Sequence, residues 1–226
     1  MEGLTCVIVG AGPGIGLSVA RRFAREGFQI ALVARRAESL QGYAEELRAE
    51  GDTARAYPAD LADLSSLPDL FARIGAELSP PDVLVYNASA VTLGLPSHLT
   101  PEQLLGDLTV SVVGALACVR EVLPVMRERG EGTIMLTGGG FALNTYAPMA
   151  SLGIGKAALR SLALSLGAEL EPQGIHAATV TILGEVREGS LFDAERIAEA
   201  YWQLHAQPRG GWSRELLYNE AYASRI

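Results

Sequence analysis

The sequence predicts an α/β fold in which a doubly wound parallel β-sheet is flanked by helices on both faces. Three observations lead to this prediction: short apolar segments rich in β-branched residues, amphipathic segments of helical period between them, and regular alternation of the two along the chain. Strands that are almost continuously apolar are typical of parallel sheets, because helices bury both faces of such sheets.

The expected strands are the apolar segments at 4–9, 29–33, 54–57, 83–86, 133–137 and 177–183. The expected helices are the amphipathic segments at 15–26, 38–50, 64–77, 101–129, 148–171 and 193–204. Right-handed crossovers between parallel strands bring the carboxyl ends of the strands to one edge, so we expect a ligand site at that edge.

Length and composition restrict the organisation and the partners. The chain has 226 residues and no linker or repeat, so one domain over 1–226 is expected, with a divergent carboxyl-terminal region from about 188 whose role cannot be read. The net charge of −8 argues against a nucleic-acid partner. The longest apolar runs have strand length, which argues against a membrane partner. No basic segment precedes the first apolar run, so a cytoplasmic location is expected.

The cysteines and histidines indicate no metal site. Cys6 and Cys118 fall in an expected strand and an expected helix, where reduced core thiols are the simplest interpretation. His98, His176 and His205 are widely separated and show no spacing typical of metal ligands.

A glycine-rich loop follows the first expected strand directly. It reads Val9-Gly10-Ala11-Gly12-Pro13-Gly14-Ile15-Gly16 and leads into a helical pattern. Glycines in this context permit a tight turn at Gly10, approach of a pyrophosphate at Gly14 and close helix packing at Gly16. The first helical amides, from Ile15 onward, would face the negative charge. A turn without a ligand is the alternative, but the number of glycines favours a Rossmann-type dinucleotide site that includes Gly12.

The end of the second expected strand indicates which dinucleotide is bound. An acidic residue there accepts from the ribose hydroxyl of NAD, whereas an arginine accommodates the 2′-phosphate of NADP. The chain has Arg35 and Arg36 at this point and no acidic residue. A solvated helix start is the alternative, although two cations at a helix amino terminus are electrostatically unfavourable. The charges favour NADP(H).

The loop spacing, together with several later motifs, resembles the short-chain dehydrogenases/reductases from residue 4 to about 188. Ala59-Asp60-Leu61 is similar to the family's adenine-contacting segment, and Val85-Tyr86-Asn87-Ala88-Ser89 to its N-N-A-G motif. Gly155-Lys156-Ala157 matches the end of its Y-x-x-x-K segment, and Val186 its nicotinamide-side P-G-x-V-x-T motif. The resemblance implies that Asp60, Leu61, Asn87, Lys156 and Val186 contact the cofactor. It also implies hydride transfer between NAD(P)H and a carbonyl or alcohol.

The chain departs from this family at the positions that move protons. Leu152 stands four residues before Lys156, where the resemblance implies a tyrosine, and Gly139 stands where it implies a serine. Ser111 replaces the asparagine of the long helix, and Glu188 replaces the threonine of the nicotinamide motif. Lys156 is retained and is the only lysine among 18 basic residues, which favours a specific role over an incidental surface position.

Two residues are candidates to replace the missing groups. Tyr146 lies in the loop before the helix that carries Lys156, and its phenol is the best candidate for an acid, although packing against apolar loop residues is the simpler interpretation. Ser111 supplies a hydroxyl on the long helix. The catalytic candidates are therefore Lys156, Tyr146 and Ser111.

Three functions remain open at the level of the sequence. The first is a divergent NADP(H)-dependent oxidoreductase that acts on a small molecule. The second is a non-catalytic NADP(H)-binding pseudoenzyme that serves as a sensor or assembly partner. The third, a scaffold that has lost the cofactor, is opposed by the intact glycine loop and Arg35. The resemblance also implies a homodimer or homotetramer, formed through the helices around 110–119 and 157–166.

Overall fold

The computed structural model describes residues 3–225 and contains one seven-stranded sheet of order β3-β2-β1-β4-β5-β6-β7. All neighbouring strands are parallel. The strands are β1 (Thr5–Val9), β2 (Gln29–Ala34), β3 (Ala54–Pro58), β4 (Val83–Tyr86), β5 (Gly132–Gly139), β6 (Ile175–Ile182) and β7 (Glu215–Tyr218). The predicted parallel sheet is therefore confirmed, with one further strand that the sequence pattern did not indicate.

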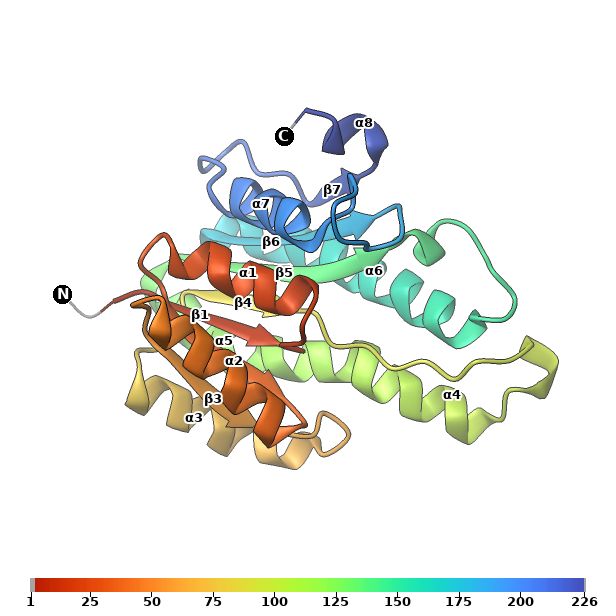
Figure 1. Cartoon of the computed structure of the whole chain (residues 1–226), viewed down its shortest axis with the longest axis horizontal. Coiled ribbons are helices and arrows are strands. Elements are labelled where there is room, and N and C mark those ends of the chain that lie inside the picture. The colour runs from red at the N-terminus through yellow and green to blue at the C-terminus, as the bar shows by residue number, and fades with distance from the viewer. Residues whose placement is uncertain (1–2, 226) are drawn as a thin grey trace.

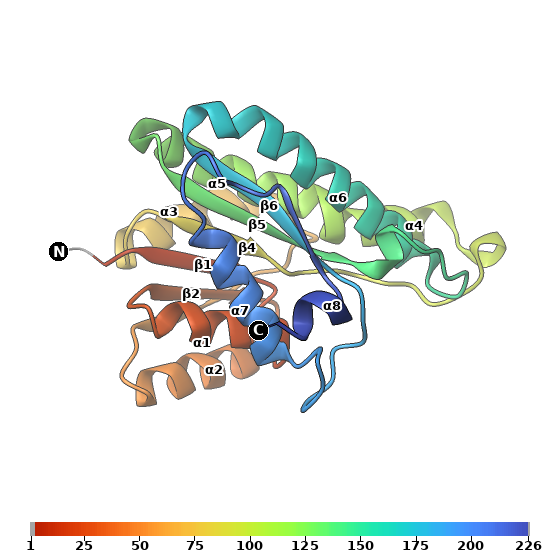
Figure 2. The ribbon, with the colours of Figure 1, turned by 90° about the horizontal axis from the view of Figure 1, so that it is seen from above.

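Helices cover both faces of the sheet, which confirms the doubly wound prediction (Figures 1 and 2). The first face carries α1 (Ile15–Ala24), α2 (Ala37–Ala49) and α7 (Ala194–His205). The second face carries α3 (Leu67–Glu77), α5 (Gly114–Arg129) and α6 (Ala150–Leu170). Figure 2 shows the sheet between these two layers.

Successive side chains along each strand point to opposite faces of the sheet and so pack against both helical layers. In β1, Cys6 and Ile8 enter the core under α1, whereas Val7 and Val9 enter the core on the opposite face, and all four are fully buried. Each valine or isoleucine side chain removed from water in this way contributes about 1.5–3 kcal/mol of hydrophobic free energy. Both cysteines are buried and free, as predicted.

The long helical segment Pro101–Arg129 consists of α4 (Pro101–Leu108), a π-helical turn (Thr109–Val113) and α5. It begins at a capping box, in which Thr100 accepts from the amide of Gln103 and the Gln103 side chain accepts from the amide of Thr100. It ends at Gly130, whose φ of 66° is left-handed.

By length and composition alone, this segment of 29 residues could cross a membrane. Its longest part without a charged residue, 108–119, is longer than the strand-length apolar runs expected from the sequence, and Arg120 and Glu121 end it. This is weak evidence for a membrane span, since core helices pass the same criterion. Cys118, Val119 and Val122 of α5 lie fully buried against the sheet.

The carboxyl-terminal region is ordered around β7 and a short helix, α8 (Glu220–Ala223). Thr179 to Ile182 of β6 pair with Glu215 to Tyr218 of β7 and so extend the sheet. An ion pair fixes this edge, since Arg160 Nε and Nη2 donate to the two carboxylate oxygens of Glu215 at 2.7 and 2.5 Å.

The order of the strands reverses between β1 and β4, which places a topological switch point at their carboxyl ends. In Figures 1 and 2, α4 and the loops beside it extend beyond these strand ends. Any ligand site of this sheet is expected at that edge.

Candidate functional site

Two adjoining cavities occupy the switch point. The first, of about 760 Å³, lies between the glycine loop, the end of β2 and the segments that follow β3 and β4. The second, of about 460 Å³, lies between the glycine loop, the end of β5 and the start of α6. Gly12, Pro13, Asn87 and Ser89 line both cavities, so together they form one elongated site along the carboxyl ends of the strands.

Two glycines of the loop are required by its packing. Gly10 has a φ of 87°, and a Cβ there would lie 2.4 Å from the amide nitrogen of Ala88. A Cβ on Gly16 would lie 2.6 Å from the carbonyl oxygen of Gly10. The loop therefore folds tightly against β4 and α1 only because both side chains are absent.

The other two glycines face open space. A Cβ on Gly12 or Gly14 would meet no atom within 4 Å, and both residues line the second cavity. Ile15, the first residue of α1, lines the same cavity. The loop thus presents bare backbone and a helix amino terminus to the site, which is the arrangement that accepts a pyrophosphate.

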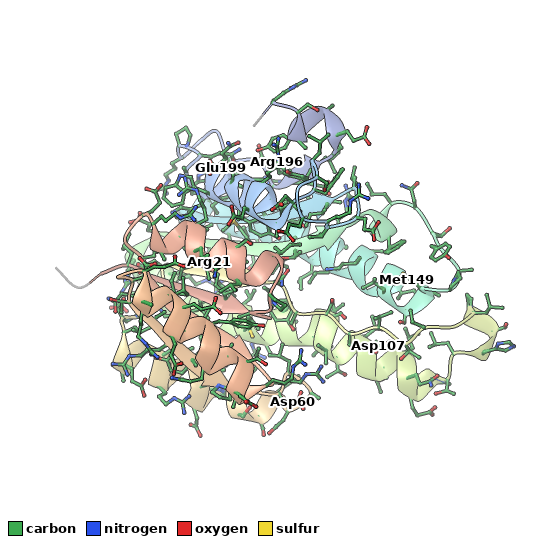
Figure 3. The ribbon with its side chains drawn as sticks, viewed as in Figure 1. Arg21, Asp60, Asp107, Met149, Arg196 and Glu199 are labelled. Atoms are coloured by element: carbon green, nitrogen blue, oxygen red, sulfur yellow. The ribbon has the colours of Figure 1, made fainter. Side chains whose placement is uncertain are left out.

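Arg35 and Arg36 line the outer end of the first cavity, after β2. Both residues are exposed, and within residues 3–225 neither guanidinium makes an ion pair or a side-chain hydrogen bond. Asp60 and Leu61 line the opposite wall, and Asp60 Oδ1 accepts from the amide of Ala62 at 3.0 Å. Figure 3 labels Asp60, which follows β3. Two guanidinium groups at a cavity mouth give that end a positive charge, which favours an anion.

Lys156 stands in the second cavity and is half-buried. Its Nζ donates to the main-chain oxygen of Thr137 at 2.6 Å, and desolvation lowers the pKa of the ammonium to about 8. The hydroxyl of Thr137 shares a hydrogen bond of 2.6 Å with the phenol of Tyr201, whose pKa is raised by burial. The stem of Lys156 lies over Gly139, where an added Cβ would be 3.7 Å from its Cε.

Comparison with known proteins connects this site to a family. The short chain dehydrogenase model matches residues 4–187. The chain belongs to the short-chain dehydrogenase family. It is 35% identical over 175 residues to 2,3-dihydro-2,3-dihydroxybenzoate dehydrogenase of Bacillus subtilis, a match that covers 77% of this chain and 67% of that enzyme.

Solved structures agree with this assignment. A metagenomic short-chain oxidoreductase in complex with NADP has a TM-score of 0.86 and 26% identity, with 96% of each chain covered. A short-chain dehydrogenase from Rhodopseudomonas palustris has a TM-score of 0.85 and 27% identity, with 94% of this chain and 96% of that chain covered.

The second cavity also holds two positions at which the family resemblance implies other residues. Leu152 stands where a tyrosine is implied and Gly139 where a serine is implied, and both line the cavity together with Phe141. Tyr146 is 55% exposed and stacks on Phe141 with ring centroids 6.2 Å apart, and it does not line the cavity. The phenol chosen from the sequence therefore lies outside the space in which Lys156 stands.

Ser111 lies outside both cavities. It is 3% exposed, accepts from the amide of Ala90 at 3.0 Å and donates to the Ala90 carbonyl at 3.4 Å. Ser111 therefore holds the segment after β4 in place.

Val186 lies at the other side of the site, where it lines the second cavity and is exposed.

Sequence reasoning missed Asp107 as a second residue that holds this segment. Asp107 Oδ2 accepts from the amide of Thr92 at 2.7 Å, and the Ser151 hydroxyl also accepts from that amide at 3.0 Å. Gly94 forms a bridge to Met149, so the segment lies fixed between α4 and the start of α6 (Figure 3). The available signal was the spacing of Asp107 and Ser111, which lie four residues apart on one helix face.

Proposed function

We propose that this short-chain dehydrogenase binds NADP(H) along the two cavities and transfers hydride between the cofactor and a carbonyl or alcohol of a small molecule. One observation carries the proposal: adjoining cavities along the strand ends have Arg35 and Arg36 at one end, without an ion pair to any described residue, and Lys156 at the other. The glycine loop lies between these ends. The 26% identical structure with bound NADP supports the same choice of cofactor.

The residues present fit the adenosine half of NADP. Arg35 and Arg36 would pair with the 2′-phosphate through charge-assisted hydrogen bonds. Asp60 and Leu61 would contact adenine, and Asn87 would hold the glycine loop beneath the pyrophosphate. No acidic residue lies at the end of β2, where NAD-specific sites carry one.

The second cavity would accept the nicotinamide half and the substrate. The nicotinamide supplies or accepts the hydride when bound. Lys156 would bind the ribose hydroxyls, Ile15 and Val186 would contact the ring, and Phe141 and Leu152 would exclude water from the reacting carbon. The apolar lining favours an uncharged carbonyl compound as the substrate.

A second candidate function is favoured by the composition of that cavity. Within residues 3–225, no phenol lines it, and Leu152 and Gly139 cannot transfer a proton. A protein that binds NADP(H) without turnover, and whose assembly depends on the cofactor, is consistent with these positions.

The decisive experiment is a pair of fluorescence titrations of the purified chain with NADPH and NADH, followed by NADPH oxidation in the presence of carbonyl compounds. We expect NADPH to bind at least about 10-fold more tightly than NADH, because paired guanidinium groups contribute about 1.5–3 kcal/mol through hydrogen bonds to charge. Binding with turnover supports the oxidoreductase, and binding without turnover supports the second candidate. Failure to bind either nucleotide would rule out both.

We also propose that residues 1–226 form one cofactor-binding domain that pairs into a cytoplasmic homodimer or homotetramer. The support is an apolar surface on the second face, where Val113, Leu116 and Ile154 are 43%, 42% and 45% exposed. A second copy of the chain would cover this surface.

A further inference from the structure

Lys156 is the only titratable residue among those that line the second cavity in the part of the chain that the structure describes. Its neighbours there are glycines, apolar side chains and the polar residues Asn87, Ser89 and Thr137. Reduction of a carbonyl requires a proton for the oxygen as well as a hydride for the carbon. A group that donates this proton from within the cavity is needed.

Two of the polar side chains that line the cavity, those of Asn87 and Thr137, already make hydrogen bonds within the protein. Asn87 Nδ2 donates to the carbonyl oxygen of Gly10 at 2.9 Å, and Thr137 Oγ1 is hydrogen bonded to the phenol of Tyr201 at 2.6 Å. The Ser89 hydroxyl has no hydrogen-bond partner among residues 3–225, but an unactivated hydroxyl is a poor acid. Tyr146 stacks on Phe141, which lines the cavity, but Tyr146 itself does not line it.

The position of Lys156 suits direct proton donation. Its Nζ uses one hydrogen for the Thr137 carbonyl, which leaves two hydrogens of the ammonium, one for a ribose hydroxyl of the cofactor and one for a substrate oxygen. Gly139 has no side chain to cover the stem of Lys156. Leu152 has no polar group that could stand between the Lys156 ammonium and the cavity. A substrate oxygen can therefore approach the ammonium without an intervening phenol or hydroxyl.

We propose that Lys156 is itself the general acid, donating its ammonium proton to the carbonyl oxygen of the substrate. This inference rests on the proposed function. The carbonyl carbon receives a hydride from the reduced nicotinamide and forms a C–H bond, and the C=O π electrons move to oxygen. An N–H bond of Lys156 breaks, its electron pair stays on nitrogen, and the proton joins the oxygen. The products are an alcohol, the oxidised nicotinamide and a neutral amine, which regains a proton from solvent.

The electrostatic surroundings of Lys156 favour this role. Burial lowers the pKa of its ammonium to about 8, so the group is a stronger acid than an ordinary lysine yet remains protonated at neutral pH. Through Thr137 it is joined to Tyr201, whose pKa is raised, so that phenol stays neutral. Asp107 on α4 is bonded to the amide of Thr92, and Arg160 on α6 is paired with Glu215. No carboxylate among the described residues that line the cavity stabilises the ammonium.

The test uses the fact that Lys156 is the only lysine of the chain. Protein grown with lysine labelled at ¹³Cε gives a single lysine side-chain resonance, and its titration reports the pKa of Lys156 directly in the unmodified chain. We expect a midpoint near 8. A midpoint at the ordinary value of lysine, above 10, would overturn the proposal whatever the activity of the protein.

The Lys156→Arg variant separates proton donation from charge. Arginine keeps the cation and its hydrogen bonds but does not release a proton in the accessible pH range. We expect this variant to bind NADPH and to reduce 9,10-phenanthrenequinone with a kcat at least about 100-fold below that of the unaltered chain. We also expect the rate of the unaltered chain to fall above the midpoint measured by NMR. Turnover by Lys156→Arg close to that of the unaltered chain would contradict the role.

The failure of this inference is distinguishable from the failure of the proposed function. If the unaltered chain does not bind NADPH, both the proposed function and the acid role of Lys156 are overturned. NADPH binding with no reduction of the quinone overturns the acid role of Lys156 and supports the non-catalytic function. Lys156→Met, which lacks both charge and proton, provides a second variant and should lose turnover and weaken NADPH binding together.

Discussion

The side-chain amide of Asn87 donates a hydrogen bond of 2.9 Å to the carbonyl oxygen of Gly10, which joins residues 77 positions apart in the chain. Asn87 follows β4 and Gly10 follows β1, so the bond crosses the switch point of the sheet. It orients the peptide between Gly10 and Ala11, whose amide at Ala11 donates to the carbonyl oxygen of Val33 at 3.1 Å. The shape of the loop therefore depends on contacts with β2 and β4.

Replacing Asn87 with alanine should weaken NADPH binding about 3- to 10-fold. The physical reason is the loss of one hydrogen bond of about 0.5–1.5 kcal/mol that holds the loop in its binding shape. Fluorescence titration measures the effect. Asn144→Ala, in an exposed loop, is the matched control and should bind like the unaltered chain. Equal affinities for the two variants would show that the bond has no part in binding.

Replacing Arg35 and Arg36 together with alanine should weaken NADPH binding about 10- to 100-fold and leave NADH binding nearly unchanged. Only NADPH carries the 2′-phosphate, and each hydrogen bond to a charged group contributes about 1.5–3 kcal/mol. Arg25→Ala, an exposed arginine at the end of α1, controls for the loss of positive charge. A parallel loss of affinity for both nucleotides would contradict recognition of the phosphate.

The double variant Gly139→Ser with Leu152→Tyr should increase kcat for quinone reduction about 100-fold, because a phenol would then share the proton transfer with Lys156. The serine fits, since a Cβ at Gly139 makes only ordinary contact with the Lys156 stem at 3.7 Å. The control is Gly139→Ser with Leu152→Phe, which adds a ring without a hydroxyl. Equal rates for the two double variants would contradict the interpretation of these positions.

The free energy of unfolding should fall between pH 7 and pH 5 because His205 is buried in its neutral form. Desolvation lowers its pKa to about 4 from 6.5, and its Nδ1 lies 2.9 Å from the hydroxyl of Thr133. Below pH 6.5 the unfolded chain binds a proton that the folded chain does not, so stability declines until the pH reaches about 4. His176, whose pKa burial also lowers, adds in the same direction.

Urea unfolding at the two pH values measures this decline, which we expect to be about 2 kcal/mol from His205. In His205→Gln the decline should be smaller, although the variant is less stable at both pH values because His205 packs against Phe23 and Phe28. His98→Gln, in an exposed loop, is the control and should keep the full decline.

Replacing Leu116 with arginine should convert the proposed oligomer into monomers. Leu116 is 42% exposed on α5, and a cation placed within a buried apolar interface lacks a partner. Light scattering coupled to size exclusion measures the mass. Leu217→Arg, a similarly exposed leucine on β7, is the control. A monomeric unaltered chain would contradict the proposed assembly.

Local pattern was sufficient for most of the fold. The prediction of β4 at Val83–Tyr86 matches the structure residue for residue. Most other predicted elements differ only at their ends, whereas the helix predicted over 101–129 is divided by a π-helical turn. This agreement arises because strands with two buried faces and helices with one apolar stripe carry strong periodicities. β7 was missed because its four residues carry little pattern and pair only with the free edge of β6.

The sequence by itself determined the class of fold, the glycine loop, the arginines after β2 and the single lysine, since each depends on residue type at a fixed distance from a strand. Only the tertiary structure decided how these groups are surrounded. It brought Thr137 and Tyr201 to Lys156, left Tyr146 outside the cavity and joined Asp107, Ser111 and Ser151 to one backbone segment. Desolvation and hydrogen-bond partners depend on residues far apart in the chain, and no local pattern records them.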